Sequence, residues 1–451
     1  MTQVGEAVAR YNKILESEPF KDLGWADSIR EQAQAKRLTL NNRPVCVVLR
    51  PHFVATRQYE AMTKAAEALM SAIQRVKQMA LASPVLMARM DMLPAEKMLA
   101  SIDPGYPHLA VTSLLDANLD NGSFQFADYM AETPPGVAFG ESLAELFYES
   151  GPVKELRKKY RLTKPGGAKF LLQALLKAYK EFGGKKSPQI GILEYRQPFQ
   201  SATSDELVLL RDYFRSHGHP TDVVSPDQLE YRDGVLRRGD FEIRLLYRRM
   251  KVQEFLVRFD LTHPLVRAYK EGSVCLVNSF RDEIAQKKAI FDLLTDEDIT
   301  SGFPAAERKV IRERIPWTRV VQETRTTYHS KSIDLLEFIS KNREKLVLVP
   351  NDTTGEHHSY RGWEIGEAQW DRAMKTALRS PYVVQERLEP VTSIFPVYQH
   401  GMLDFKPLCV DVQPHAFLGK VHGCSTWLRS ALSSGYTSQV GLAPTFLLDA
   451  K

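Results

Sequence analysis

The chain has 451 residues, of which 43% are hydrophobic and 25% are charged, a composition typical of a globular protein with about three domains or lobes. Its formal charge of +5 is small for this length and does not favour nucleic acid as a partner. The four cysteines show no metal spacing, no apolar run is long enough to span a bilayer, and the N-terminus has no signal-peptide pattern. We therefore expect a reduced, cytoplasmic protein without a membrane partner.

The N-terminal part is predicted to be mostly helical around one short strand. Residues 1–40 have a mixed-charge helical pattern, and the apolar run Val45–Leu49 is typical of a buried strand. From Thr56 to Leu81 apolar residues recur at helical spacing. A second helical stretch is expected to continue to about Ala100.

Residues 109–136 are predicted to form a β-hairpin that carries two carboxylates. Two strand-like runs flank the triplet D-N-G at residues 120–122, whose glycine suits the left-handed position of a tight loop. A three-residue loop turns Asp116 and Asp128 to the same face, whereas a two-residue loop turns them to opposite faces. Two converging carboxylates suit a hard cation such as Mg²⁺, and solvated hairpin carboxylates are the alternative interpretation.

Residues 152–188 are basic and helical and end in GGKKSP, which marks a linker and a domain boundary. The cations of this stretch form either a solvated helix face or a phosphate-binding surface: Lys154, Arg157, Lys158, Lys159 and Arg161.

Residues 189–282 alternate strands and helices, with a helix at Asp205–Ser216 and a hairpin turn at Asp233-Gly234, which predicts a Rossmann-like unit. Neither a G-x-G-x-x-G motif nor a P-loop motif is present, so dinucleotide and P-loop functions are not expected here. Arg248 and Arg249 follow the strand at Ile243–Tyr247, where they hold either a substrate carboxylate or a surface salt bridge.

The stretch 345–388 is predicted to form a strand, a loop, a helix and a second strand. An apolar strand is followed by a polar loop to Gly362, and an amphipathic helix stops before Pro381. The second strand runs into Gln385 and Glu386.

These elements resemble the circularly permuted ATP-grasp family, in the branch of glutathionylspermidine synthetase. AETPPG, VPND, GWE and YVVQER occur in family order, and the resemblance extends from about residue 40 to residue 448. It implies an α/β (α+β), ATP-grasp-like two-lobed fold, circularly permuted, with a Rossmann-like pre-ATP-grasp domain. The implied division is 1–152 for N-terminal helices and large-lobe strands, 189–282 for the substrate domain, and 283–451 for the small lobe, hinge and remaining large-lobe strands.

The resemblance also implies ATP and Mg²⁺ as cofactors. Asp116 and Asp128 take the positions of magnesium-holding carboxylates. The implied nucleotide contacts are Lys288 with Lys287 as the alternative, Gly355 in the loop that covers the phosphates, and Gln385 and Glu386 at the adenine hinge.

Several positions depart from the family pattern in their chemistry. Met130 replaces an asparagine, and a thioether is a poor ligand for a hard cation. Leu114 replaces an arginine, Val349 replaces the lysine that reaches the phosphates, and Glu356 adds negative charge to the covering loop. Arg429 takes the place of a further family arginine only if the register shifts.

We therefore expect a protein related to ATP-dependent carboxylate–amine or carboxylate–thiol ligases, with impaired or absent catalysis, that binds a nucleotide, a peptide or a partner enzyme. The alternative is an active ligase that proceeds through an acyl phosphate, acts on a small-molecule or peptide substrate, and has a rebuilt phosphate site using His357 or His358.

Overall fold

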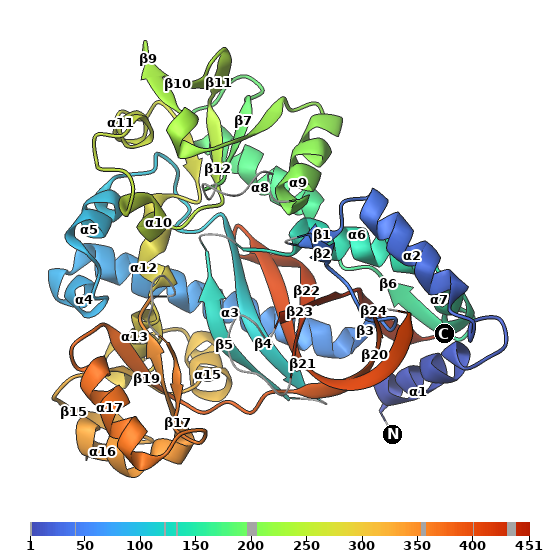
Figure 1. The fold of residues 1–451 in the computed structure, drawn as a ribbon. Coiled ribbons are helices and arrows are strands. Elements are labelled where there is room, and N and C mark those ends of the chain that lie inside the picture. The colour runs from blue at the N-terminus through green and yellow to red at the C-terminus, as the bar shows by residue number, and fades with distance from the viewer. Residues whose placement is uncertain are drawn as a thin grey trace.

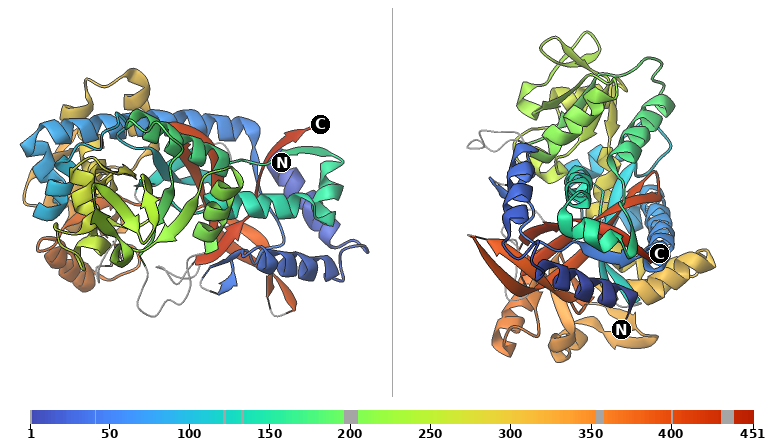
Figure 2. Two further views of the ribbon diagram at one scale, coloured as in Figure 1. Left: turned by 90° about the horizontal axis from the view of Figure 1, so that it is seen from above. Right: turned by 90° about the vertical axis from the view of Figure 1, so that its right-hand side faces the viewer.

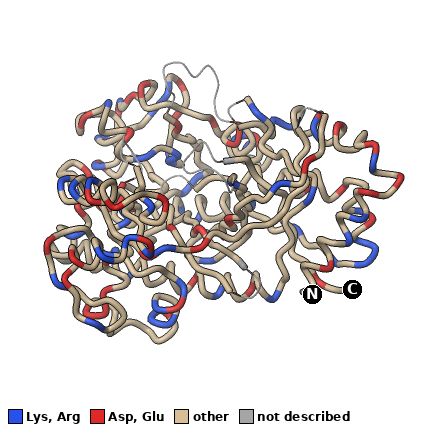
Figure 3. Tube along the Cα trace, turned by 60° about the horizontal axis from the view of Figure 1, so that its bottom comes forward, with Lys and Arg blue, Asp and Glu red and all other residues tan. Residues whose placement is uncertain are grey.

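Figure 1 shows the fold in a computed structural model of the chain. The structure describes residues 2–40, 42–120, 123–131, 134–195, 205–352, 358–399, 401–430 and 439–451. Within these ranges helices and sheets are mixed, and three sheet-containing parts surround the candidate site. No helix in these ranges has both the length and the apolar character needed to cross a membrane. Basic and acidic residues are interspersed along the trace (Figure 3).

An antiparallel six-stranded sheet forms the body of the molecule, at the centre of Figure 1. Its order is β23-β22-β21-β4-β5, with β20 paired to β21, so a hairpin from the first third of the chain joins strands from its C-terminal part. The bounds are β4 Thr112–Asp120, β5 Ser123–Met130, β20 Thr392–Gln399, β21 Met402–Phe417, β22 Lys420–Ser430 and β23 Gln439–Ala443.

The long helix α3, Thr56–Ala82, runs along one side of this body (Figure 2). The helical spacing predicted for Thr56–Leu81 is confirmed, because the apolar side chains of α3 lie in the main core with strands β4, β5 and β21. Short helices extend this core toward the small sheet described below: α4 Pro84–Arg89, α5 Pro94–Ser101, α12 Glu283–Gln286, α13 Ala289–Leu294, α14 Glu297–Thr300 and α15 Ala305–Arg314.

The flank on the right of Figure 1 combines the two ends of the described chain. Strand β24, Thr445–Ala450, lies between β3, His52–Ala55, and β6, Tyr160–Thr163. Around it are β1 Thr39–Leu40, β2 Arg43–Pro44, α1 Gln3–Leu15, α2 Gly24–Ala35, α6 Val137–Tyr148 and α7 Gly151–Arg157.

The predicted strand at Val45–Leu49 is wrong. Its side chains at 45, 48 and 49 are buried as expected for apolar residues, but the segment makes only an isolated bridge, between Val48 and Val397. Its backbone groups bond to several different elements, including the carbonyl of Pro396 and the N–H of Leu442, so no ladder with a single strand forms. Burial of an apolar run therefore did not require regular strand structure here.

Residues 189–282 contain a four-stranded parallel sheet, at the top of Figure 1. Its order is β13-β12-β7-β8, and β7 and β12 are buried along their whole length, as expected for a sheet covered on both faces. The predicted turn at Asp233-Gly234 is confirmed, since both residues have positive φ and join β9 to β10. The bounds are α8 Ala168–Glu181, β7 Ile190–Leu193, α9 Asp205–Ser216, β8 Thr221–Val224, β9 Glu230–Arg232, β10 Val235–Arg238, β11 Phe241–Ile243, β12 Leu245–Arg248, α10 Val252–Leu256, α11 Pro264–Lys270 and β13 Cys275–Val277.

A smaller antiparallel sheet, β14-β19-β17-β18, lies at the lower left of Figure 1. One of its faces packs against α16 and α17 around the fully buried Trp370. The predicted strand, helix and second strand are confirmed as β17, α17 and β19. The bounds are β14 Thr318–Val320, β15 Arg325–Tyr328, β16 Lys331–Asp334, α16 Leu335–Lys341, β17 Leu346–Pro350, β18 Tyr360–Arg361, α17 Glu367–Ala377 and β19 Tyr382–Glu386.

Candidate functional site

The β4–β5 hairpin places Asp116 directly opposite Asp128, on one face of the six-stranded sheet. Its register differs from our prediction, because Asp120 pairs with Ser123 and only two residues connect the strands. A β-bulge with Ala127 as the extra residue then shifts the pairing by one and returns both carboxylates to the same face. The predicted three-residue loop is therefore wrong, although the two carboxylates do converge.

Strand β21 adds a third carboxylate that sequence reasoning did not assign to the site. Asp411 is buried and accepts two hydrogen bonds from the guanidinium of Arg429, one of them 2.9 Å long. Burial, followed by the charges of Asp411 and Asp128, raises the pKa of Asp116 to about 8, against the lowering effects of Arg429 and Lys288. Asp116 is therefore mostly protonated at neutral pH, and its Oδ1 is buried without a hydrogen-bond partner among the described residues.

Lys288 reaches this group of carboxylates from α13. The residue is 8% exposed, and its Nζ lies 2.7 Å from Oδ1 of Asp128. The backbone N–H of Lys288 donates to the carbonyl of Asn351, 3.0 Å away, and the N–H of Ala289 donates to the Asn351 side chain. The VPND segment that ends β17 is thereby fastened to the start of α13. The hairpin at 109–136 and the unit at 345–388 meet at Lys288.

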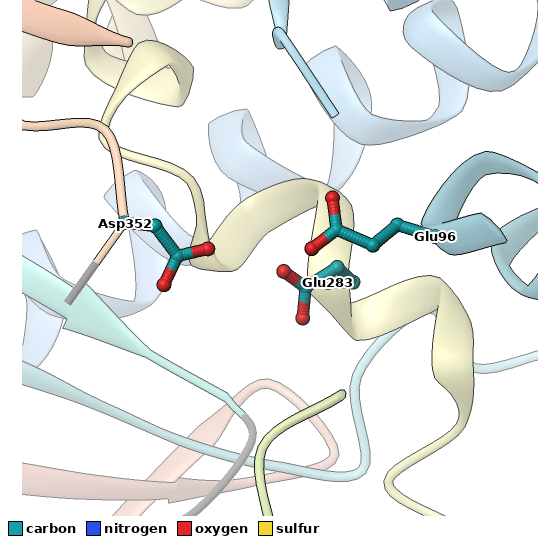
Figure 4. A group of neighbouring side chains, drawn as sticks. All are labelled: Glu96, Glu283 and Asp352. Carbon is teal, nitrogen blue, oxygen red and sulfur yellow. The ribbon is translucent and has the colours of Figure 1, made fainter. Parts of the chain in front are cut away.

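Lys287, the alternative phosphate contact, points to different surroundings. Its Nζ lies 2.8 Å from Glu283 and 2.9 Å from Glu96, and it also contacts Asp352. These carboxylates come from α12, α5 and the segment after β17, and oxygens of the three lie within 4.8 Å of one another (Figure 4). Burial lowers the pKa of Lys287, but the three carboxylates together raise it above its ordinary value. Lys287 thus partly offsets the charge of a buried acidic cluster, and Lys288 alone of the two pairs with Asp128.

Gln385 and Glu386, the two predicted hinge residues, lie on opposite faces of the small sheet. Gln385 is buried and donates to Oγ1 of Thr318 over 3.0 Å. Glu386 accepts hydrogen bonds from Tyr328 at 2.7 Å and from the backbone of Trp317 at 3.1 Å. It lines a cavity of about 640 Å³ beside the β15–β16 hairpin.

The face of the small sheet turned away from α16 and α17 carries Val347 and Val349, and Val349 takes the position where the resemblance implies a lysine. Val347 pairs with Gln385 on one side and with Arg361 on the other, so these three side chains share a face. Gly355, His357 and Glu356 lie outside the described residues. His358 lies within them, and its carbonyl accepts a hydrogen bond from Tyr382.

Arg248, predicted as a substrate contact, is fully buried at the end of β12. Its guanidinium donates to the carbonyls of Met250 at 2.7 Å and of Asn278 and Ser279 at 3.0 Å. Arg248 therefore anchors the backbone after β12 and β13, and the site proposed below does not include it.

Arg249 turns toward the segment that follows the hairpin. Its guanidinium donates to the carbonyl of Pro134 and lies 3.6 Å from Glu206. Glu206 in turn accepts from the backbone N–H groups of Gly136 at 2.7 Å and Ala138 at 3.2 Å. The arginine and the glutamate together hold this segment at the edge of the site.

Polar side chains continue across the sheet from the acidic pair. The pairing of Val412 with Ala117 sets Gln413 opposite Asp116, and Gln413 pairs with Ser425 on its other side. His415 Nε2 lies 3.1 Å from Oγ of Ser425, and burial, aided by Arg249, lowers the pKa of His415 to about 3.

Three atoms on this face are buried without a hydrogen-bond partner in the described part of the chain: Gln413 Oε1, His415 Nδ1 and Trp427 Nε1. Unpaired buried polar groups cost free energy, so this face suits a ligand or water that supplies the missing partners. The alternating polar residues at 411, 413 and 415 were the available sequence signal.

No family model and no curated protein matches the sequence. Among solved structures, a glutathione synthetase-like effector from Globodera pallida, in its apo form, is 12% identical, with 94% of this chain and 96% of that chain covered and a TM-score of 0.59. A putative gamma-glutamylcysteine synthetase from Methylobacillus flagellatus is 11% identical, with 88% and 87% covered and a TM-score of 0.39. The ATP-grasp ligase PsnB, complexed with minimal precursor, Mg and ADP, is 12% identical, with 58% and 88% covered and a TM-score of 0.29.

The first of these matches shows the fold. The chain shares the fold of that effector over nearly its whole length. This result agrees with the ATP-grasp-related fold that the sequence predicts.

Proposed function

We propose that the protein is a circularly permuted, ATP-grasp-like relative of ATP-dependent carboxylate–amine or carboxylate–thiol ligases, with impaired or absent catalysis. The division into 1–152, 189–282 and 283–451 is part of this proposal. The observation that carries it is internal pairing at the candidate site: Lys288 with Asp128, and Arg429 with Asp411. The cations and carboxylates that would hold a magnesium-bound triphosphate already satisfy one another.

The donor set fits magnesium poorly in this arrangement. Carboxylates suit the ion, but Asp128 and Asp411 are paired with side-chain cations, and burial together with the neighbouring carboxylates raises the pKa of Asp116. Met130 lies on the same face, because it pairs with Leu114 two residues from the acidic pair, and its thioether is a soft donor. A magnesium ion would have to replace the ammonium of Lys288 at Asp128.

The part of the candidate site that would face the phosphates also lacks a positive charge that the family pattern has. Val349 is half-buried on β17 and has no hydrogen-bonding group where a lysine would stabilise developing phosphoryl charge. Loss of one such interaction costs on the order of 10²–10³ in rate. A protein of this kind would retain its fold as a binding module for a nucleotide, a peptide or a partner enzyme.

One observation favours the alternative, an active ligase with a rebuilt phosphate site. Arg361 shares a face with Val347, one strand away from the missing lysine. Burial raises the pKa of Cys409, and Arg429 and Arg361 both act against that rise, which places Arg361 near β21. Lys288, Arg361 and Arg429 would then hold the phosphates, Asp116 and Asp128 would hold Mg²⁺, and Arg249 would bind a small-molecule or peptide substrate.

The test measures Mg-ATP binding by thermal shift together with release of ADP. We expect no ADP release by the wild type, and a larger Mg-ATP shift for Val349→Lys/Met130→Asn than for the wild type. Lys341→Ala, which changes an exposed lysine of the small sheet's helix layer, is the matched control. Magnesium-dependent ADP release by the wild type, abolished by Lys288→Ala or Arg361→Ala and retained by the control, would establish the alternative.

A further inference from the structure

A basic groove is lined by residues of α7, β6 and the end of α6. These elements lie on the flank of the molecule away from the small sheet (Figure 1). Its volume is about 670 Å³, within the range of small-molecule sites. The described residues that line it include no acidic side chain. They do include six cationic side chains: Lys154, Arg157, Lys158, Arg161, Lys164 and Lys451.

Two of these cations gather around one aromatic ring. The guanidinium of Arg157 lies 3.6 Å from the ring centre of Tyr148, and Nζ of Lys164 lies 4.9 Å from the same centre. Such contacts restrict long, flexible side chains before any ligand binds. Arg157 also donates to the backbone carbonyl of Tyr148, 3.3 Å away. The groove thus has one partly ordered cationic wall.

The ion pairs of the groove leave its positive charge available. Arg161 makes no ion pair with the residues that the structure describes. Three lysines have partners outside the lining, and exposed pairs of this kind contribute only about 0–1 kcal/mol. These pairs are Lys154–Glu149, Lys158–Glu155 and Lys164–Glu145. An anion in the groove can therefore recruit the lysines at small cost.

Tyr160 supplies an independent observation. It lines the groove, is 3% exposed, and its hydroxyl has no hydrogen-bond partner among the described residues. A buried hydroxyl without a partner is rare in folded proteins, because it loses its bonds to water without replacement. Because this hydroxyl is itself buried, a cationic side chain drawn inward by a bound anion would satisfy it.

We infer that this groove binds a compact polyanion, a molecule that carries several phosphate groups. Arginine and lysine both recognise phosphate, and so many cations around one small volume match clustered negative charge. An acidic peptide spreads its carboxylates along an extended chain and would leave part of the groove unmatched. The phosphates belong either to a soluble molecule or to a lipid headgroup. The groove is separate from the Asp116–Lys288 site, so this inference does not depend on the proposed function.

The test is calorimetric titration with inositol hexakisphosphate at physiological ionic strength. We expect Lys158→Ala/Arg161→Ala to weaken binding at least about tenfold, because two of the lining cations are removed. The matched control is Lys169→Ala, an exposed lysine of α8 that does not line the groove, with a change below about twofold. Equal loss in both variants, or no binding by the wild type to this probe or to the vesicles below, would overturn the inference.

Two further variants determine whether the probe binds in the groove or at the Asp116–Lys288 site. Tyr160→Phe is expected to weaken binding without lowering the melting temperature, since its hydroxyl makes no bond within the described structure. Lys288→Ala is expected to leave binding of the probe unchanged. If Lys288→Ala weakened binding and Lys158→Ala/Arg161→Ala did not, the probe would bind at the Asp116–Lys288 site and the inference would be overturned.

Vesicles of phosphatidylcholine with and without a bisphosphorylated phosphoinositide distinguish the two phosphate sources. Binding that requires the phosphoinositide and is lost in Lys158→Ala/Arg161→Ala supports a lipid headgroup. Binding of the soluble probe alone supports a soluble ligand.

Discussion

Two neighbouring lysines, Lys287 and Lys288, have the same chemistry and opposite surroundings. Lys287 is enclosed by carboxylates from three parts of the chain, and its single charge partly offsets theirs. Lys288 contacts a carboxylate that is 37% exposed, next to Asp116 with its unpaired oxygen. The first cluster holds α5, α12 and the end of β17 together. The group around Lys288 includes a buried oxygen, Oδ1 of Asp116, that makes no hydrogen bond within the described structure. The difference indicates that the Lys287 cluster stabilises the fold and that the group around Lys288 forms the candidate binding site.

The largest effect is expected for Lys287→Met. Removal of this cation leaves buried carboxylates uncompensated, so the free energy of unfolding in urea should fall by about 3–5 kcal/mol. Lys341→Met, which removes an exposed lysine from a helix surface pair, should change it by less than about 0.5 kcal/mol. Similar values for both variants would mean that the Lys287 cluster does not hold the fold together.

A smaller effect is expected from pH on the polar row beside the Lys288 site. The pKa of His415 is about 3 in the folded protein and about 6.5 in the unfolded chain. As the pH falls, the unfolded chain therefore binds a proton on this ring at a higher pH than the folded protein does. Stability contributed by the neutral ring is present above pH 6.5 and is lost as pH falls toward 3, at about 1.4 kcal/mol per unit.

Between pH 6.5 and 4.5 this loss should amount to about 2–3 kcal/mol in the wild type. The glutamine variant His415→Gln should lack that part of the pH dependence, as measured by denaturant unfolding at each pH. An unchanged slope in the variant would show that the ring is protonated or solvated in the folded state.

Lys288→Ala should cost less than Lys287→Met, about 1–2 kcal/mol, because Asp128 is partly solvated and can remain charged. Urea unfolding of both variants under one condition measures the difference. If Lys288→Ala proves as destabilising as Lys287→Met, the contrast between a structural and a functional lysine fails.

The smallest effect is expected for Asp116→Asn. Asp116 is protonated at neutral pH and its Oδ1 has no partner in the described structure, so the free energy of unfolding at pH 7 should change by less than about 1 kcal/mol. Asp352→Asn weakens a contact of Lys287 and should destabilise more. If Asp116→Asn destabilised the protein more than Asp352→Asn, the carboxylates around Asp116, and not the Lys287 cluster, would be the ones that stabilise the fold.

Local patterns in the sequence determined much of the fold. The apolar spacing of α3, the limits of α9 and the turn at Asp233-Gly234 agree with prediction, because periodicity and turn chemistry depend on near neighbours. Val45–Leu49 shows the limit of that reasoning. Its side chains are buried as predicted, yet its backbone bonds to elements hundreds of residues away.

The candidate site was only partly predictable. The convergence of Asp116 and Asp128 was expected, but through the wrong loop, because a bulge at Ala127 has no clear signal in a single sequence. The contributions of Asp411, Gln413 and His415 depend on strand β21 lying beside β4, and this pairing joins segments that are far apart in the chain.

The sequence by itself determined most of the elements, and its ATP-grasp-related resemblance implied the loss of a charge at Val349 and of an oxygen ligand at Met130. Only the tertiary structure decided which of two adjacent lysines faces Asp128, and it brought Asp411 and Arg429 close to Asp116. The physical reason is that periodicity and turns are local properties of the chain. Charge pairing and the shift in the pKa of Asp116 depend on distances between residues that meet only after folding.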